Sequence, residues 1–398
     1  MRSFETEKAK QITNTIRLRG PISQTQIAQI TGIGSSTISN NVKILLETGW
    51  IREDCRVSIK KTGRPHLLLD VDPNAAFAIG IDVGSQNLRV GLVNLAGEIL
   101  NSVSEKTRPE SGPEDILCRA KKITHQIIAN SSIGLEKIDG VGFGLSGMID
   151  PKEGVCLLCP NLPGWDGLSV REIFSEEFKM DILFDDSVPM MALAEKRYGL
   201  GRNVDDFVYI SLGIGIGCAI FIHGVLYRGH ANLAGEFGHI TVEAKGPLCR
   251  CGNLGCLEAL ASANAIVQRA KGSVQLGIHS SLSDNIDEIY RNDDVKAIAQ
   301  AAEEGDKSAF EILDRTGMYI GIGIAALINI LNPSMVILGG GITRSGEVLL
   351  SSIKQTVRKQ ALGIISRTVS IQKSQIKEYA GVIGGATAVF DRIFASVK

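Results

Sequence analysis

The sequence predicts an α/β protein in two parts: an N-terminal winged helix-turn-helix module over residues 1–72, and a body of alternating strands and helices over 73–398. Short helix-like segments with polar caps fill the first fifty residues, and glycine turns close strand-like runs from residue 75 onward. Charge follows the same division. Residues 1–72 carry 11 Lys and Arg against 7 Asp and Glu, whereas the rest carries 31 against 36. A basic piece on an acidic body favours a polyanionic partner.

Several features of the composition favour a cytoplasmic protein. The N-terminal stretch lacks the apolar segment of a secretory signal, and no apolar run reaches the roughly 18–20 residues of a membrane span. The 8 cysteines are not spaced like a disulfide framework. Because the cytoplasm keeps thiols reduced, clustered cysteines there favour metal over disulfides. We therefore expect a cytoplasmic chain without a membrane partner.

Three helices are expected before residue 50, separated by short breaks. The first covers 6–18 and ends at the Gly-Pro step that follows it. Ser23 is placed to cap the second helix, and Ser35 or Ser36 the third. The helical spacing of apolar residues in the third helix predicts one buried face. Two short helices with a Gly-containing turn between them are typical of a helix-turn-helix unit.

The opposite face of the third helix carries small and polar side chains that can contact phosphates and base edges in a major groove. These candidates for DNA contact are Ser35, Ser36, Thr37, Ser39, Asn40 and Lys43. Two strand-like runs around a turn at 61–65 predict a wing with Arg64 at its tip. The alternative is a helical protein-interaction module with a solvated polar face. Helix lengths, turn, wing and basic charge together favour double-stranded DNA as the partner.

The body shows strand-like runs that are broken by glycines. They lie at 77–100, 139–150, 206–229 and 333–343, and the last leads into a helix over 346–357. Alternation of strands and helices implies an α/β domain with turns at the strand ends, where ligands usually bind. Glycines there allow backbone N–H groups to approach phosphates closely, although packing explains any one of them equally well.

A histidine and three cysteines gather within eighteen positions. They are His239, Cys249, Cys251 and Cys256. Three thiolates and one imidazole make a closed tetrahedral set that fits structural Zn²⁺, and four protein ligands leave no open position for catalysis. The alternative is a loop of buried free thiols. A second C-x-x-C, formed by Cys156 and Cys159, has no histidine nearby, so we expect these two to be core residues.

These segments together resemble the ROK family of repressors, open reading frames and sugar kinases, and within it the Mlc/NagC/XylR type of sugar-responsive regulator. The motifs occur in family order: 82–84, the glycines at 213, 215 and 217, the His–Cys cluster, and 332–333 leading into 339–341. The resemblance implies an actin/hexokinase-like fold with two lobes. Lobe one would cover about 73–190 plus the C-terminal helix at about 380–396, and lobe two about 191–379.

The resemblance also implies zinc at the four cluster positions and a sugar site beside it. The implied sugar-binding residues are Asn161, Asp185, Asp186, Glu236, His239 and Glu258. Asp186 occupies the place of the kinase base, and Asp185 replaces the usual asparagine. Each assignment has an alternative without a ligand. The two aspartates could simply cap a helix. Glu258 could be a carboxylate that stabilises the first turn of a helix expected over 257–270. Gly144, Ser146 and Gly147 are weaker candidates, and Trp165 is expected to serve packing.

The two loops that would bind the phosphates of ATP differ in sequence from those of the family's kinases. Their Asp-x-Gly-Gly-Thr loop is Asp82-Val83-Gly84-Ser85-Gln86 here, and their Gly-Thr-Gly loop is Ser211-Leu212-Gly213, so hydroxyl groups are lost and side-chain bulk is gained. The simplest hypothesis is a sugar sensor without kinase activity, working as a homodimer or homotetramer and repressing sugar-uptake or sugar-use genes. The alternatives are a sugar kinase with a DNA-binding head and a regulator released by a transport-system protein. Residues 65–75 would form the lever between head and body.

Overall fold

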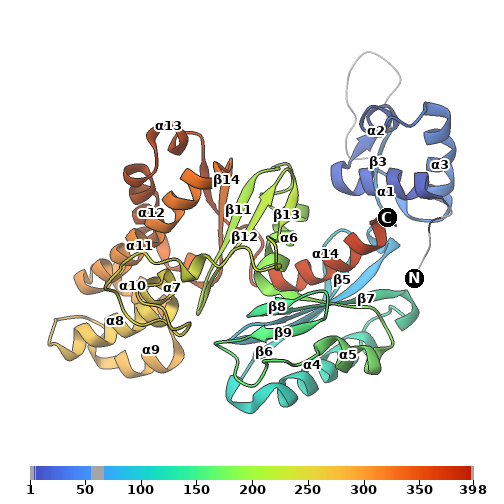
Figure 1. Ribbon diagram of the computed structural model, residues 1–398. Helices are drawn as coiled ribbons and strands as arrows, with labels where there is room; N and C mark the ends of the chain where they lie inside the picture. The colour runs from blue at the N-terminus through green and yellow to red at the C-terminus, as the bar shows by residue number, and fades with distance from the viewer. Residues whose placement is uncertain (1–3, 5, 55–66, 396–398) are drawn as a thin grey trace.

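The computed structural model describes residues 4, 6–54 and 67–395, and it shows a small head attached to a two-lobed body (Figure 1). Two five-stranded sheets, one in each lobe, carry helices on their faces, so the predicted α/β class is confirmed. Among the described residues, no helix combines the length and apolar character that crossing a bilayer requires.

The head contains the three expected helices and a small antiparallel sheet of order β1-β3-β2. Its elements are α1 (Glu7–Arg19), β1 (Ile22–Ser23), α2 (Gln24–Thr31), α3 (Ser35–Glu47), β2 (Ile51–Asp54) and β3 (Leu68–Val71). Ser23 caps α2, as predicted, and the structure adds a reciprocal capping box with Gln26. The pairing of β2 with β3 confirms the hairpin of a wing, whereas Arg64 lies outside the described residues.

The serine cap predicted for the third helix is wrong. Gly34 is the N-cap residue, because its backbone is still extended, and Ser35 is already the first helical residue. Gly34 offers no side chain, so no side-chain cap forms. The hydroxyl groups of Ser35 and Ser36 are therefore not used as caps and lie on the exposed start of α3.

The two sheets of the body share one topology. In each sheet the first three strands are joined by two hairpins and pair antiparallel. Two further strands are added at the other edge of the first strand and run parallel to it. Lobe one has the order β10-β7-β4-β5-β6, with β4 (Phe77–Val83), β5 (Asn87–Asn94), β6 (Ile99–Lys106), β7 (Ile138–Leu145) and β10 (Ile182–Asp186). Lobe two has the order β13-β12-β11-β14-β15, with β11 (Phe207–Leu212), β12 (Ile216–Ile222), β13 (Val225–Tyr227), β14 (Met335–Gly339) and β15 (Ser370–Lys373).

Helices cover both sheets. The sheet of lobe one packs against α4 (Gly112–Ala129) and α5 (Val170–Phe178), and the small ribbon of β8 (Met148–Asp150) and β9 (Val155–Leu158) lies beside it. The core of lobe two is built from its sheet and the helices α7 (Leu257–Ala261), α8 (Ala263–Gln275), α9 (Ile286–Asn292), α10 (Val295–Glu303), α11 (Lys307–Leu331), α12 (Gly346–Gln360) and α13 (Gly363–Ser366). The strand predicted within 333–343 is present as β14, and the helix predicted over 346–357 is present as α12.

The second face of the lobe-one sheet is covered by the C-terminal helix α14 (Ala380–Phe394). Two glycines of the sheet allow the helix to lie directly on it. A Cβ atom on Gly80 would lie 1.9 Å from the carbonyl oxygen of Val382, and one on Gly142 would lie 2.0 Å from that of Gly385. Contact of this kind between the helix backbone and the sheet backbone requires glycine at both positions of the sheet.

Helix α6 (Ser187–Tyr198) lies between the two lobes and contacts both. One face packs on α14, where a Cβ atom on Gly384 would meet the carbonyl of Met190 at 1.8 Å. The other face brings Ala192 into a cluster with Phe207, Tyr209 and other residues of the lobe-two sheet. Helix α6 thus spans the expected boundary at residue 190 and connects the lobes physically.

The head and the body share one hydrophobic core. Residues of α1 and α3 form a single buried cluster with β4, β5 and α14. At its edge, Asp391 of α14 accepts from two arginines: Arg17 of α1 at 2.6 Å and Arg197 of α6 at 3.0 Å. Burial acts to raise the pKa of Asp391, but the two guanidinium groups outweigh it and hold that pKa below its usual value. We call these three residues the Asp391 junction.

Two local expectations need correction. The single helix expected over 257–270 is two helices, because Ser262 has extended backbone and its hydroxyl caps α8 at the N–H of Ala265. Cys156 and Cys159 are buried core residues as expected, but their sulfur atoms are joined as a disulfide, so these two are not the reduced thiols predicted. The turn after β9 brings both sulfur atoms together inside the core.

Breaking the Asp391 junction should destabilise the protein. We expect Asp391→Asn to lower the Tm in scanning calorimetry by about 3–6 °C, since two arginines lose their charged partner. Glu347→Gln is the control. It removes an exposed pair with Lys373 and should change the Tm by about 1 °C or less. The difference between wild type and Asp391→Asn should shrink as the pH falls below about 4, because Asp391 is then protonated in the unfolded protein first and, below its lowered pKa in the folded protein, in both states. Equal Tm values for both variants at neutral pH would contradict the role given to the junction.

Candidate functional site

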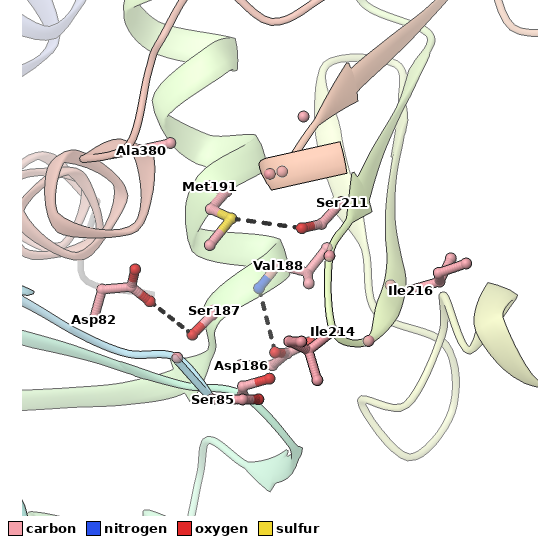
Figure 2. A pocket seen from close by; sticks show the side chains of 18 of the residues that line it. Asp82, Ser85, Asp186, Ser187, Val188, Met191, Ser211, Ile214, Ile216 and Ala380 are labelled. Carbon is pink, nitrogen blue, oxygen red and sulfur yellow. Dashed lines mark hydrogen bonds between the residues drawn. The ribbon is translucent and has the colours of Figure 1, made fainter. Parts of the chain in front are cut away.

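A cavity of about 530 Å³ lies between the lobes, and loops at the strand ends of both sheets line it. Figure 2 shows part of its wall, where Asp82, Ser85, Asp186 and Ser187 approach one another beside the start of α6. The cavity contains both the predicted sugar positions and the predicted phosphate loops. Of the six predicted sugar-binding residues, five line it: Asn161, Asp186, Glu236, His239 and Glu258.

Asp186 is the N-cap of α6, and its Oδ1 accepts from the backbone N–H of Val188 at 3.2 Å. The plain interpretation as a helix cap is therefore correct, and it does not exclude a second role, since the carboxyl also faces the cavity. Burial raises the pKa of Asp186 well above its usual value, and the neighbouring carboxylates of Asp185 and Glu236 add to the rise. A carboxyl with this environment gains from a hydrogen-bonding ligand that replaces lost water.

Asp185 is the sixth predicted residue and is not among those that line the cavity. Both of its oxygens are held by Arg228, which follows β13 in lobe two, at 3.2 and 2.5 Å. Its Oδ1 also accepts from the backbone N–H of Asp186 at 2.9 Å. Asp185 thus ties the start of α6 to the opposite lobe, and its assignment as a ligand contact stays a prediction.

The sugar half of the cavity is the part that the predicted sugar-binding residues line. On the side of lobe two its wall is formed by Glu236, His239 and Glu258. Glu258, in the first turn of α7, accepts from the backbone N–H of Ile216 at 2.8 Å. Partial burial and the carboxylate of Glu258 raise the pKa of Glu236, while His239 acts to lower it. Nε2 of His239 lies 4.0 Å from Oε2 of Glu236. Two carboxylates and an imidazole on one wall can accept and donate hydrogen bonds to the hydroxyl groups of a sugar.

The predicted metal ligands come together in the structure. One ligand atom from each of His239, Cys249, Cys251 and Cys256 lies within 4.8 Å of all the others. Nδ1 of His239 lies 3.7 Å from Sγ of Cys249, and Sγ of Cys251 lies 3.7 Å from Sγ of Cys256. Tetrahedral zinc with Zn–S bonds of ~2.3 Å requires sulfur ligands about 3.8 Å apart. The donor set and its spacing therefore fit zinc.

The phosphate half of the cavity is bounded by a buried ion pair at the ends of β4 and β5. Asp82, at the end of β4, is 1% exposed, and its Oδ1 accepts from the hydroxyl of Ser187 at 3.0 Å. Arg89, opposite Asp82 in the β4–β5 register, places Nη1 at 3.8 Å from Oδ2 of Asp82. Ser85 and Gln86 line the cavity beside them.

Contacts across the cleft also involve residues that the sequence did not indicate. Arg250 of the metal-cluster loop donates to Oδ1 of Asn161 in lobe one. This pair and the Arg228–Asp185 pair join positions 89 and 43 residues apart, and neither arginine belongs to a motif. Ser146 and Gly147 line the cavity, whereas Trp165 is fully buried and serves packing, as expected.

The predicted DNA-contact residues of α3 lie on one side of the head. Ser35, Ser36, Ser39, Asn40 and Lys43 are exposed, and Thr37 is half-buried. The opposite face buries Ile38, Val42 and Leu45 in the head's core. A helix with an exposed polar face, followed by a short hairpin, has the geometry of a recognition helix that binds in the major groove of DNA.

Comparison with known proteins identifies both parts of the chain. Residues 6–52 match the winged helix-turn-helix DNA-binding domain, and residues 78–392 match the ROK family. The chain belongs to the ROK family. Its fold is a winged helix-turn-helix followed by an actin/hexokinase-like ROK domain, as the resemblance implied.

Both repressors and kinases occur among its ROK relatives. The xylose repressor of Caldicellulosiruptor bescii is 32% identical over 365 residues, which cover 91% of this chain and 90% of the relative. The glucokinase of Thermotoga maritima is 35% identical over 315 residues, which cover 79% of this chain and 98% of the relative. A ROK family transcriptional regulator described as a homologue of the E. coli Mlc protein superposes with a TM-score of 0.79 at 25% identity, covering 97% and 96% of the two chains.

Loss of one cluster ligand should release metal and loosen the loop. We expect Cys251→Ser to lose most bound zinc, measured by plasma mass spectrometry, and to lower the Tm by about 5–10 °C, since metal binding is coupled to folding. Cys118→Ser is the control, because Cys118 is an exposed free cysteine of α4 outside the cluster. Purified wild type without zinc, or a Cys251→Ser variant that retains it, would show that the cluster is not a zinc site.

Proposed function

We propose that this chain is a transcriptional repressor of sugar-uptake or sugar-use genes, and that a sugar or sugar phosphate in the cleft between the lobes controls its affinity for operator DNA. One observation carries the proposal: the helix that Asp186 caps in the pocket carries Arg197 in its last turn, and Arg197 pairs with the same Asp391 as Arg17 of the head. The xylose repressor and Mlc-type relatives support it, since both names denote regulators.

The sugar half of the cavity holds the effector in this proposal. Asp186 approaches a hydroxyl from lobe one, while Glu236, Glu258 and His239 bind from lobe two, so a bound sugar contacts both lobes. Asn161 exchanges its contact with Arg250 for one with the sugar. A ligand that touches both lobes binds one state of closure more tightly than the other and shifts the equilibrium between them.

Zinc would support this wall of the site when it is bound at His239, Cys249, Cys251 and Cys256. With Nδ1 of His239 among the zinc ligands, the ring proton would be held on Nε2, which lies 4.0 Å from Oε2 of Glu236. The imidazole then donates a hydrogen bond into the cavity in one fixed orientation. The same coordination fixes the loop that carries Arg250.

Helix α6 transmits the change from the pocket to the head. Its first residues contact the ligand site, one of its faces packs on the lobe-two sheet, and its last turn joins the Asp391 junction. A shift of α6 relative to α14 therefore changes the seating of α1 and the spacing of the two heads in a homodimer or homotetramer. Residues 68–75, the described part of the predicted lever at 65–75, belong to the same buried cluster through Leu69, Val71 and Ala75, so they follow this shift.

Double-stranded DNA is the partner of the head. Phosphate contacts supply much of the affinity, and the exposed residues of α3, from Ser35 to Lys43, supply base contacts. Two heads on a symmetric assembly read a two-fold operator. A cytoplasmic location follows from this partner.

A ROK sugar kinase with a DNA-binding head is the second candidate, and the glucokinase relative favours it. Asp186 stands where the family's base stands, and it faces the cavity. Against this, Ser85, Gln86 and Leu212 replace the small and hydroxyl residues of the kinase phosphate loops, so we expect no productive hold on ATP. A coupled assay of ATP turnover with sugars separates the candidates, since sustained turnover would establish the kinase.

The proposal is tested by operator binding with and without sugars. Promoter fragments from sugar-use genes of the source genome are screened by mobility shift, and the retained fragment is titrated with xylose, glucose and their phosphate esters. We expect one of these ligands to weaken DNA binding at least about tenfold, which is within the usual range of coupling between sites. Glu258→Gln should abolish the response while binding DNA normally, and Glu176→Gln, an exposed residue of α5, should respond like wild type. Failure to bind any fragment would refute the proposal.

A further inference from the structure

A second cavity, of about 840 Å³, lies in lobe two beside the loop that carries the metal cluster. Residues of this loop and of α7, α8 and α11 line it. Its volume is within the roughly 300–1,000 Å³ of small-molecule sites. Asn161, Ile214 and Glu258 line this cavity and the cavity between the lobes, so the two adjoin. We call it the lobe-two cavity.

Positive charge predominates in the lobe-two cavity. Two carboxylates line it, and both already have a partner: Glu258 accepts from the N–H of Ile216, and Oε2 of Glu243 accepts from the hydroxyl of Tyr319 at 2.8 Å. Among the residues that the structure describes, no cation of the lining lies within 4.0 Å of a carboxylate oxygen. The cations of the lining are Lys245, Arg250, Arg269 and Arg315.

Arg269 of α8 is held in the wall without a negative partner. It donates to the main-chain carbonyls of Leu260 and Ile312, which bind the guanidinium but do not neutralise it. Burial lowers the pKa of Arg269 to about 10, and repulsion by Arg315 adds to the effect. A buried charge without a counter-charge is destabilising. The missing partner of Arg269 is therefore an anion.

Arg315 of α11 lies one turn after Ile312, so it is close to Arg269. Its Nη2 donates to the hydroxyl oxygen of Tyr319 at 2.9 Å, and Tyr319 in turn donates to Glu243 of the metal-cluster loop. These contacts bring cations from α8, α11 and the loop to one wall. Leu260 and Leu276 add apolar surface to the lining, which fits the carbon skeleton of an organic molecule.

We propose that the lobe-two cavity binds a small organic anion, whose carboxylate or phosphoryl oxygens lie between Arg269 and Arg315. Guanidinium groups match both oxyanions in geometry and form strong, charge-assisted hydrogen bonds with them. An anion between the two arginines also removes their mutual repulsion, which a neutral ligand does not. Lys245 and Arg250 add positive charge at the edge of the site. The existence of this site does not depend on the proposed function.

Arg250 couples the anion site to the sugar half. It lines only the lobe-two cavity, yet it donates to Oδ1 of Asn161, which lines both cavities. An anion that attracts Arg250 releases Asn161 for a contact with the sugar. The anion should therefore tighten sugar binding, and the sugar should tighten anion binding by the same factor. This coupling, unlike the site itself, rests on the proposed function.

Isothermal titration of the full-length zinc-bound protein tests the site with citrate, glycerol 3-phosphate and inorganic phosphate, in a phosphate-free buffer. Citrate carries only carboxylates and glycerol 3-phosphate only a phosphoryl group, so the two probes separate the possible sources of the oxyanion. Glycerol is the uncharged control. We expect one of the two organic anions to bind with a Kd below about 1 mM, and glycerol to give no heat.

Variants locate the bound anion. Arg315→Gln should weaken its binding about tenfold or more, and Arg315→Lys should restore part of the loss, because lysine keeps the charge without the planar geometry. Arg269→Gln should act in the same direction, and its Tm establishes that it is folded. Arg358→Gln, at an exposed arginine of α12, is the matched control. Arg344→Gln changes an exposed cation of the cavity between the lobes and should leave anion binding unchanged.

Four outcomes overturn the inference. They are no binding of either organic anion by wild type, wild-type affinity in Arg315→Gln, loss of affinity in Arg344→Gln in its place, and binding of inorganic phosphate as tight as that of the better organic anion. A titration of xylose and glucose at saturating anion tests the coupling, and an unchanged sugar affinity would refute the coupling alone. Failure of the proposed function looks different, because operator DNA is then not bound while the anion still binds.

Discussion

The ion-pair cluster at Asp391 is the interaction on which the rest of this structure depends. It joins three elements from separate parts of the chain: α1 of the head, α6 from the cleft and α14 from the C-terminus. Because α14 rests directly on the lobe-one sheet through Gly80 and Gly142, Asp391 is anchored to that lobe, and a movement of α6 changes the position of Arg197 relative to it. The same geometry that stabilises the fold thus couples the cleft to the DNA-binding head.

The cleft contains charged groups whose burial without a ligand is energetically unfavourable. Asp186, Asp185 and Glu236 bring carboxylates close together, and Arg228 compensates only one of them. Polar groups of this kind cluster where binding supplies the missing partners, so the free protein gains from an effector that carries hydroxyl groups.

Local patterns were sufficient for much of this picture. The capping box at Ser23, the strand-and-glycine runs and the cluster around His239 are short-range signals, and the structure contains each of them. The helix break at Ser262 and the cap at Gly34 depend on backbone conformation, which residue type alone does not determine. Arg228, Arg250 and the Asp391 junction could not be predicted, because each pairs residues that only the tertiary fold brings together. Site roles that depend on a bound ligand remain predictions.

The central claim is that ligand binding at the start of α6 reaches the head through the Asp391 junction. Its most direct test measures operator affinity and effector affinity together in Arg197→Gln, which removes the α6 end of the junction and leaves Arg17 paired with Asp391. The claim predicts effector affinity within about twofold of wild type and an operator affinity that no longer responds to effector. An unchanged operator response in this folded variant would contradict the claim.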